Sequence, residues 1–400
     1  MSSAPFLQRV VLKNYRSIES CNLELGALTL LVGPNGSGKS NFLDALRFVS
    51  DSLRTTIDHA LRDRGGINEV RRRSSGHPTH FGIRLELRLR DGVPCTYAFR
   101  VGARPHGGFE VQKEECVVGG PTPATFNVER GSRQSKTTSG LTSSAVPTDR
   151  LSLVSASGEE AFRPVYDCLA SMAFYNLNPD RIRDLQTPDA GDLLLRDGSN
   201  AASVLRTLAE EDPQRRKRVD LYLSQVVPGV TGVEPEIVGP KETLLFRQSV
   251  KGAKAPWRFY AANMSDGTLR AFGILLSLFQ YRRDVPVSLV GIEEPEAALH
   301  PGTSGFLLDA LREVSDTTQV LVTSHSPDLL DRIDLDRETL LAVYAEDGDT
   351  RIAPIDRASR TVLRQGLYTP GELLRLNQLA PDIDSVIASR QMKLFGEGLS

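Results

Sequence analysis

The stretch "LLVGPNGSGKSNFLDAL", residues 30–46, places a glycine-rich loop between two segments of regular apolar pattern. Residues 33–40 satisfy the pattern G-x-x-x-x-G-K-[ST] at every fixed position. The apolar runs in residues 6–32 predict strands, and apolar residues at steps of three and four over residues 42–53 predict an amphipathic helix. Strand, loop and helix in this order form the context in which such a loop cradles phosphate groups.

The chemistry expected at this loop follows from its residue types. Glycines let the backbone curl so that successive N–H groups point at phosphate oxygens, and the helix N-terminus adds its partial positive charge. Lys39 would reach the β and γ phosphates, and the Ser40 hydroxyl would bind Mg²⁺. The residues expected to contact the nucleotide here are Gly33, Asn35, Gly36, Ser37, Gly38, Lys39, Ser40 and Asn41.

Length and charge limit what the rest of the chain can be. Its 400 residues exceed the roughly 250–300 residues at which a single core stops growing. We expect an N-terminal lobe with the loop and a β subdomain (1–157), a mainly helical insert with strands (158–260) and a C-terminal lobe (261–400). The net charge of -2, from 48 basic and 50 acidic side chains, gives no overall field that attracts nucleic acid, so any such binding needs local patches.

Apolar segments and cysteines indicate the compartment. No stretch approaches the 18 or so apolar residues of a membrane span, and the N-terminus "MSSAPFLQRV" lacks a signal-peptide core, so we expect a cytoplasmic protein without membrane contact. The four cysteines are scattered without a C-x-x-C pair or a zinc-like histidine spacing, so they are expected to be small buried or semi-exposed thiols. They are Cys21, Cys95, Cys116 and Cys168.

The middle of the chain gives a coarser pattern. Residues 61–80 are polar, basic and glycine-containing, which favours a mobile connection, and residues 119–150 are rich in Ser, Thr, Gly and Pro, which favours a flexible loop. Alternating residues predict a hairpin over 81–101 and a further strand to about 118. Helical periodicity predicts a helical insert over about 158–228, followed by further strands up to about residue 262.

A pair of carboxylates marks a second candidate site. In "VSLVGIEEPE" an apolar strand ends at Glu293 and Glu294, and ligands of open parallel sheets bind at such strand ends. One carboxylate can hold magnesium through water, while the next can orient and deprotonate the attacking water. The alternative is an acidic first turn of a helix, where such residues offset the helix dipole.

Two more motifs complete a recognisable set. "MSDGT", residues 264–268, precedes an apolar helix pattern, and "TSHSP", residues 323–327, places His325 at a strand end. With the loop and the Glu-Glu pair, this set resembles the ABC-type ATPase superfamily. "LKNYRSIESCNLEL", "IEEPEAALHP" and "TSHSPDLL" are similar to the branch with RecF, SMC and OLD-family proteins, particularly its stand-alone AAA-type ATPases without a Toprim nuclease domain. The matching motifs lie in about residues 6–55 and 262–332.

This resemblance implies an α/β fold: a P-loop NTPase head with a mixed central sheet flanked by helices, an antiparallel β subdomain and an inserted helical subdomain. It also implies a head-to-tail homodimer that sandwiches two ATP molecules. Ser265 and Gly267 would then contact a γ-phosphate held by the other protomer. The remaining implied roles are Glu294 as general base, His325 as γ-phosphate sensor, Ser40 and Glu293 at the magnesium, and Arg16 near the base or α-phosphate of the nucleotide.

The sequence departs from the family pattern at three places. Glu293 stands where most of the superfamily carries Asp, and the signature has Ser-Asp-Gly instead of Ser-Gly-Gly. No glutamine follows the first helix at a suitable distance, where the nearest residues are Asn68 and Glu69, so the glutamine-loop metal ligand is unassigned. His300 is either a polar group near the dimer seam or a helix-end hydrogen-bonding residue. The other histidines, expected at the surface, are His59, His77, His80 and His106.

The motifs leave the output of the ATPase open. A transporter subunit is disfavoured by the long middle region and the missing glutamine. Basic clusters in residues 61–73 and 213–218 can neutralise nucleic-acid phosphates. Alternatively, residues 215–218 form a solvated helix face, and residues 71–73 contact nucleotide or a neighbour.

The tail gives no nuclease signal. Asp347 and Asp349 have the spacing of a metal site, although a hairpin turn around Gly348 explains them equally simply. About 75 residues follow His325, fewer than a Toprim domain needs. We therefore expect a separate effector, such as a nuclease, in anti-phage defence or DNA maintenance. The rival interpretation is a nucleotide-controlled scaffold with little hydrolysis.

Overall fold

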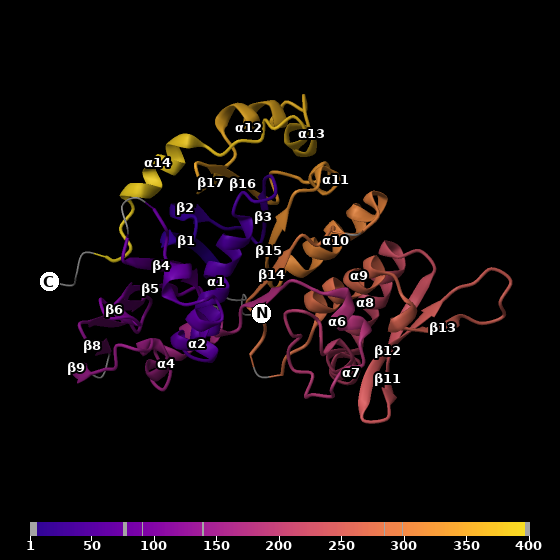
Figure 1. Ribbon diagram of the computed structural model, residues 1–400, viewed down its shortest axis with the longest axis horizontal. Helices are drawn as coiled ribbons and strands as arrows, with labels where there is room; N and C mark the ends of the chain where they lie inside the picture. Colours follow the sequence, from indigo (N-terminus) through magenta and orange to yellow (C-terminus); the bar gives the residue numbers. More distant parts are fainter. Residues whose placement is uncertain are drawn as a thin grey trace. The chain divides into compact units, whose positions relative to one another are not determined.

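The chain forms two compact units in the computed structural model, which describes residues 6–74, 78–89, 91–137, 140–283, 285–297 and 299–396 (Figure 1). Unit 1 comprises Met1–Met172, Glu338–Tyr368 and Leu376–Ser400. Unit 2 comprises Ala173–Arg337 and Thr369–Arg375. This division cuts across the three lobes expected from the sequence, because Glu338–Tyr368 and Leu376–Ser400, a part of the expected C-terminal lobe, belong to the unit in which the chain begins.

Unit 1 contains an antiparallel sheet in the order β2-β1-β4-β5-β6-β7-β8-β9. The predicted hairpin over residues 81–101 is confirmed as the pair β4–β5. One face carries an aromatic cluster of Tyr15, Phe48, Phe81 and Phe99, all fully buried. The strands are β1 (Phe6–Tyr15), β2 (Ile18–Glu24), β4 (His80–Arg88), β5 (Pro94–Ala103), β6 (Phe109–Val118), β7 (Ala124–Glu129), β8 (Ser132–Thr137) and β9 (Gly140–Ala145).

The flexible loop predicted for residues 119–150 is wrong, because β7, β8 and β9 occupy most of it. In β7, Phe126 and Val128 face the core, but β8 buries Arg133 and Ser135 instead of apolar residues. The Arg133 guanidinium lies over the Phe126 ring at 5.0 Å and pairs with Glu159 at 2.6 Å. Strands are predicted from the alternation of apolar and polar residues. Because the inward side chains of β8 are polar, its sequence lacks this alternation and did not predict a strand.

The mobile connection predicted for residues 61–80 is also wrong over most of its length. The chain there forms α2 (Ile57–Arg62) and α3 (Ile67–Val70). Arg64 between them is 7% exposed and bonds to Asp44 and Asp51 at 3.0 and 2.8 Å. Because Arg64 is charged, the sequence of this segment is polar and predicts a surface connection, although the side chain is buried and paired with carboxylates. Residues 75–77 of this segment lie outside the described part of the chain.

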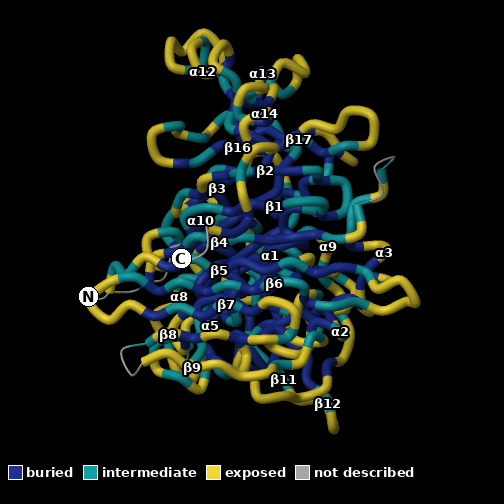
Figure 2. The backbone as a smooth tube through the Cα atoms, turned by 90° about the vertical axis from the view of Figure 1, so that its left-hand side faces the viewer, coloured by how far each residue is buried: buried dark blue, intermediate teal, exposed yellow. Residues whose placement is uncertain are grey.

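The second layer of unit 1 holds the glycine-rich loop. Strand β3 (Leu28–Val32) pairs in parallel with β16 (Thr339–Glu346), which forms a hairpin with β17 (Asp349–Pro354). Asp347 and Gly348 have φ values of 52° and 82°, so the predicted turn is confirmed. Helix α1 (Lys39–Arg54) follows the loop as predicted, and β1, β4 and α1 appear largely buried in Figure 2. The other helices of this unit are α4 (Ser152–Ala156), α5 (Arg163–Ala170), α12 (Arg357–Arg364) and α14 (Ile383–Gln391).

Unit 2 combines a parallel sheet with helices. Its strands β10 (Ala173–Tyr175) and β15 (Gln319–Ser324) both pair in parallel with β14 (Leu289–Glu293). Strand β10 corrects the helical prediction for this stretch, since its three residues are all buried within the parallel sheet. The helices are α6 (Pro179–Arg183), α7 (Ala201–Glu211), α8 (Pro213–Val226), α9 (Asp266–Phe279), α10 (Ser304–Ser315), α11 (Pro327–Leu330) and α13 (Pro370–Arg375), with 3₁₀ turns η1 (Ala261–Asn263) and η2 (Pro301–Thr303).

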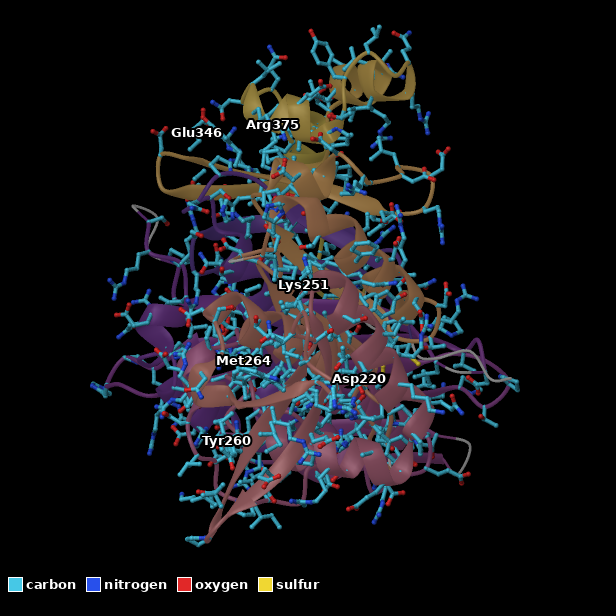
Figure 3. All side chains as sticks on the ribbon, turned by 90° about the vertical axis from the view of Figure 1, so that its right-hand side faces the viewer. Asp220, Lys251, Tyr260, Met264, Glu346 and Arg375 are labelled. Carbon is cyan, nitrogen blue, oxygen red and sulfur yellow. The ribbon has the colours of Figure 1, made fainter. Side chains whose placement is uncertain are left out.

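The strands predicted near residues 233–262 form the antiparallel sheet β11-β12-β13. They span Val230–Val238, Lys241–Gln248 and Trp257–Tyr260. Tyr260 ends β13, and Met264 lies in the segment that joins β13 to α9, where Figure 3 labels both residues. Helix α9 is buried from Thr268 onward except at Arg270, which confirms the prediction of a buried helix.

Candidate functional site

The glycine-rich loop of unit 1 leads directly into the N-terminus of α1. Gly36 and Gly38 have positive φ values of 76° and 98°, which glycine adopts without steric cost. No side chain caps the first turn of α1, and that turn contains no acidic residue. Neither a capping side chain nor an acidic residue therefore offsets the positive end of this 16-residue helix, which suits an anion.

Two of the loop glycines are required by the packing of β16 and β17. A Cβ on Gly33 would lie 2.1 Å from the carbonyl oxygen of Val343. A Cβ on Gly38 would lie 1.9 Å from Oγ1 of Thr350. Thr350 also donates from its hydroxyl to the carbonyl of Ser37 at 3.0 Å. The hairpin distant in sequence therefore fixes the shape of the loop.

Lys39 folds back over the loop that precedes it. The side chain is buried, and its Nζ donates to the carbonyls of Gly33 at 2.8 Å and Pro34 at 2.9 Å. Asn35, Gly36 and Ser40 are exposed, whereas Ser37 is buried and its Oγ has no hydrogen-bond partner among the described residues. A phosphate group is a ligand that these donors together can satisfy.

Asn41 holds the loop from the side. Its Nδ2 donates to Oγ of Ser17 at 2.6 Å, and Ser17 lies 2.7 Å from the hydroxyl of Thr350. The structure therefore assigns Asn41 a supporting contact that the motif alone does not reveal.

Asp44 on α1 is the centre of a buried ion cluster. Arg64, Arg47 and Arg16 lie 3.0, 2.6 and 2.9 Å from its carboxylate, and Tyr15 donates to it at 2.9 Å. Burial alone would raise the pKa of Asp44, but the guanidinium groups outweigh burial and hold this pKa below its usual range. Arg16, which has a φ of 49°, is thus held against α1, the helix that follows the loop.

In unit 2 the Glu-Glu pair lies at the C-terminal end of β14, as the sequence predicts. Glu293 is the last residue of the strand, and Glu294 adopts a φ of 46°, a left-handed conformation that is uncommon for residues other than glycine. Arg270 on α9 donates to the carbonyls of Glu293 and Glu294 at 3.1 and 3.2 Å. Helix α9 therefore stabilises the strained turn that carries the carboxylates.

Glu294 and His325 are brought together by the parallel pairing of β14 and β15. Glu293 is in register with Thr323, so the residues that follow the two strands share one edge. Nδ1 of His325 lies 3.2 Å from Oε1 of Glu294, although this buried nitrogen lacks a partner with hydrogen-bond geometry. The two catalytic candidates thus lie in contact distance within one unit.

The carboxylate of Glu293 accepts a hydrogen bond from an arginine. Nη2 of Arg196 donates to Oε1 of Glu293 at 3.0 Å. No sequence pattern indicated Arg196, because it lies in an irregular segment about 100 residues earlier. A metal at Glu293 would have to compete with this guanidinium.

Glu296 is a buried carboxylate that sequence reasoning missed. It is 9% exposed, and its Oε1 accepts from Oγ of Ser324 at 2.6 Å and from the backbone N–H of His325 at 3.3 Å. Its Oε2 is buried without a hydrogen-bond partner in the described part of the chain. The only available signal was a third acidic residue in "EEPE", directly after Pro295. Glu296 fixes the backbone on which His325 is carried.

The signature segment is capped and clamped within unit 2. Ser265 is the N-cap of α9, accepts from the N–H of Thr268 at 3.3 Å and is exposed, with Gly267 in the first turn. Asp266, the departure from Ser-Gly-Gly, pairs with Arg183 on α6. The unusual aspartate therefore has a structural partner.

The remaining polar candidates make local contacts. Nδ1 of His300 accepts from the N–H of Gly302 at 3.1 Å, which is the helix-end role. Arg72 pairs with Asp349 at 2.6 Å, and Arg218 bonds to Glu313 at 2.7 Å. Both basic clusters are thus at least partly engaged in intramolecular contacts. His77 lies outside the described residues.

The cysteines are buried and free, as predicted. Burial raises the pKa of Cys21 to about 12.

In the described residues no three or more His, Cys, Asp or Glu side chains are grouped as metal ligands. Among those same residues, no helix is long and apolar enough to cross a membrane.

These features define the class of the protein: a P-loop ATPase head with α/β architecture. Residues 6–80 match a family described as an AAA ATPase domain. Residues 195–331 match a family described as an AAA domain, putative AbiEii toxin, Type IV TA system.

Curated relatives match over short stretches. An OLD nuclease of Thermus scotoductus is 49% identical over 43 residues, which are 11% of this chain and 8% of the relative. The chromosome partition protein Smc of Methanocaldococcus jannaschii is 48% identical over 44 residues, 11% of this chain and 4% of the relative. The matches thus span less than a tenth of the length of these relatives.

Solved structures agree with the fold over most of the chain. An Smc head domain with an extended coiled coil from Pyrococcus furiosus, bound to the C-terminal domain of ScpA, has a TM-score of 0.55 at 13% identity, covering 91% of this chain and 99% of that one. An SmcHead bound to the C-winged helix domain of ScpA gives 0.55 at 13% identity, with 89% and 99% covered. Together the family matches and the short curated matches support an ABC-type ATPase similar to RecF, SMC and OLD-family proteins, and the solved structures share its fold.

Proposed function

We propose that the protein binds and hydrolyses ATP with Mg²⁺. The observation that supports this most is the phosphate loop, in which the Lys39 side chain folds back over the loop and no side chain caps the N-terminus of α1. Lys39 would exchange its contacts with Gly33 and Pro34 for the β and γ phosphates. The amides of the loop from Gly36 to Ser40 would donate to the same phosphates.

The proposed magnesium ligands are Ser40 and Glu293. Ser40 is exposed at the start of α1, and Glu293 carries a carboxylate at a strand end, so both are oxygen donors of the kind that Mg²⁺ prefers. When bound, the ion would neutralise phosphate charge. Glu293 must leave Arg196 to serve in this way.

Glu294 is the proposed general base and His325 the proposed γ-phosphate sensor. Nδ1 of His325 lies 3.2 Å from Oε1 of Glu294, so a movement of one side chain would affect the position of the other. Glu294 would hold and deprotonate the attacking water. The motif set, rather than a distance, supports the proposal that these residues act on the nucleotide held by the phosphate loop.

We further propose a head-to-tail homodimer in which Ser265 and Gly267 contact nucleotide on the partner. Ser265 is exposed and Gly267 is half-buried at the N-terminus of the 14-residue helix α9, a position that suits a phosphate arriving from outside the unit. The similarity to an OLD nuclease and the toxin-related family description suggest a separate effector, such as a nuclease. They also suggest a role in DNA maintenance or anti-phage defence in the cytoplasm. Direct contact with DNA remains part of this proposal.

The experiment is ATP hydrolysis by the purified protein with Mg²⁺, in the presence and absence of single- and double-stranded DNA. Lys39→Ala should abolish turnover, whereas Lys136→Ala, at an exposed position of strand β8, should leave it unchanged. Hydrolysis that persists in Lys39→Ala would refute the assignment. Degradation of DNA by the protein alone would refute a separate nuclease.

A nucleotide-controlled scaffold is the second candidate. The contact of Arg196 with Glu293 favours it, because a guanidinium on the proposed metal ligand opposes hydrolysis. In that case ATP would drive dimerisation with little turnover. Arg196→Ala should then raise turnover from a low basal rate.

A further inference from the structure

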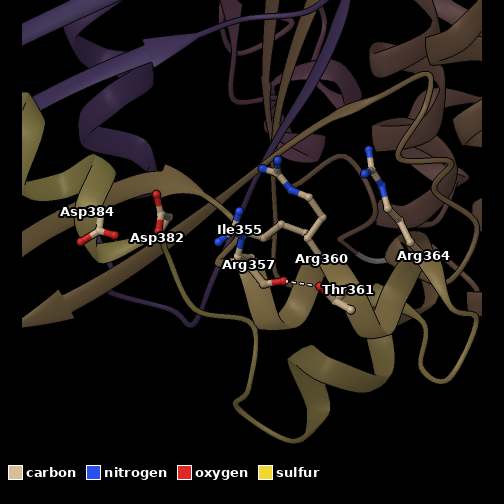
Figure 4. A pocket seen from close by; sticks show the side chains of 7 residues that line it. All are labelled: Ile355, Arg357, Arg360, Thr361, Arg364, Asp382 and Asp384. Carbon is tan, nitrogen blue, oxygen red and sulfur yellow. Dashed lines mark hydrogen bonds between the residues drawn. The ribbon is translucent and has the colours of Figure 1, made fainter.

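A concave pocket in unit 1 is lined by none of the residues of the two candidate sites described above. It has a volume of about 480 Å³ and is formed by α12, the end of β17 and the start of α14 (Figure 4). Arg357, Arg360 and Arg364 of α12 line one side, and Asp382 and Asp384 line the other. This volume lies within the range of about 300–1,000 Å³ that is usual for small-ligand sites.

The three arginines lie on one face of α12 because of their spacing. Positions i, i+3 and i+7 of a helix project from the same side. They span about 10 Å of helix axis at roughly 1.5 Å per residue. Figure 4 shows Arg360 and Arg364 extending side by side in the same direction from the helix. The opposite face of α12 is anchored by Ser359, which is buried and bonds to Asp356 and Gln378.

These guanidinium groups differ from other arginines of the same unit. Arg64, Arg72 and Arg390 each contact a carboxylate within 3.0 Å. Across the described ranges of the chain, the side chains of Arg357, Arg360 and Arg364 form neither an ion pair nor a hydrogen bond, and all three are exposed. Three like charges on one short helix repel one another, so an anionic ligand that bridges them would be stabilised.

The opposite side of the pocket restricts which anion fits. Asp382 caps α14 by accepting from the N–H of Ser385 at 3.2 Å, and Asp384 is an exposed acid in the first turn of that helix. Two carboxylates facing three arginines disfavour a polyanion whose internal phosphates run through the pocket, because the carboxylates would repel those phosphates. They favour the end of a ligand, with a terminal phosphate on the arginine side and hydroxyl or amino donors on the carboxylate side.

We propose that this pocket binds the terminal phosphate of a nucleotide, with the arginines as forked donors to the phosphate and Asp384 as acceptor from the ligand's hydroxyl groups. Arginine suits this role because its planar guanidinium donates two parallel hydrogen bonds to phosphate oxygens. The phosphate monoester comes either from a free mononucleotide or from the 5′ end of a nucleic-acid strand. The site is independent of the ATPase proposed above.

The test measures binding of three probes to the full-length protein. They are AMP, followed by calorimetry, and a 3′-fluorescein hexanucleotide with either a 5′-phosphate or a 5′-hydroxyl, followed by fluorescence anisotropy. The site variant is Arg360→Gln with Arg364→Gln. The control is Arg88→Gln with Lys136→Gln, which removes the same charge from exposed positions on β4 and β8. Lys39→Ala reports on the phosphate loop, and thermal unfolding midpoints check that every variant is folded.

The expected result is binding of AMP, of the 5′-phosphorylated probe, or of both, by wild type, the control and Lys39→Ala. The arginine variant should bind at least about tenfold more weakly. Preference for AMP would identify a free nucleotide as the source, and preference for the oligonucleotide would identify a strand end. The proposal is overturned if the two oligonucleotides bind equally and AMP does not bind. It is also overturned if Lys39→Ala abolishes binding while the arginine variant retains it, or if no probe binds.

Discussion

Single residues of the phosphate loop are fixed by neighbours that lie far away in the sequence. The motif identifies Lys39 and the glycines, but the environment of Asp44 comes from Arg16 and Arg64 on either side of it. Sequence pattern could predict the loop because its residues are consecutive. It could not predict Asp44, Glu296 or Arg270, because each is defined by contacts with segments that only the fold brings near.

Asp44→Asn tests the buried ion cluster. The pKa of Asp44 is lower in the folded protein than the value of about 3.9 in an unfolded chain. The ionised carboxylate therefore stabilises the folded protein above about pH 3.9, and this stabilisation is lost as the pH falls through the folded-state pKa. At pH 7 the variant should lose about 3–5 kcal/mol, because the buried Arg64 loses one of its two carboxylate partners and Arg16 and Arg47 lose the same carboxylate. Urea unfolding should show this difference shrinking below about pH 4, and a constant difference would argue against the ion cluster.

Glu296→Leu tests the support of His325. The change leaves the Ser324 hydroxyl without its acceptor, so we expect a loss of about 1–3 kcal/mol of stability. ATP turnover should fall with a smaller change in KM, because the sensor would be displaced and the phosphate loop would be untouched. Glu296→Gln, which retains an acceptor oxygen, should be milder in both measurements. Equal effects of the two variants would contradict the positioning role.

At the scale of elements, the glycine-rich loop depends on the hairpin of β16 and β17. Gly38→Ala places a Cβ against Thr350 and imposes a φ of 98° on a residue with a side chain. We expect a loss of about 1–3 kcal/mol together with weakened nucleotide binding, measured by urea unfolding and by titration with a fluorescent ATP analogue. Gly36→Ala, which also has positive φ but open space around its Cβ, is the matched control. If both variants bind equally, the hairpin does not shape the loop.

Elements with a strong apolar period were predictable, and those with polar inward faces were not. The α1 helix, the β4–β5 hairpin and the buried α9 follow from spacing alone. Strand β8 and the segment around Arg64 were missed because a buried arginine in each carries its charge into the core with a carboxylate partner. A hydropathy pattern predicts that such charged residues lie at the protein surface.

At the scale of the whole molecule, the proposed dimer makes each ATP site dependent on two chains. Lys39→Ala removes the phosphate contact of one chain, and Ser265→Arg blocks the signature of the other. Each variant alone should be inactive, whereas an equimolar mixture should recover turnover, because a mixed dimer contains one intact pair of phosphate loop and signature. Light scattering should show ATP-dependent dimers of wild type. A mixture without recovered activity would contradict the head-to-tail arrangement.

Turnover of Mg-ATP by wild type and Glu294→Gln is the most direct measurement of the central claim. If Glu294 is the general base, the variant should lose about 100-fold or more of the hydrolysis rate while retaining bound ATP, as quantified after rapid desalting. Glu293 and His325 remain in place, so nucleotide binding itself should persist. Equal turnover by the two proteins, or no turnover by wild type, would contradict the account of a Glu294-dependent ATPase.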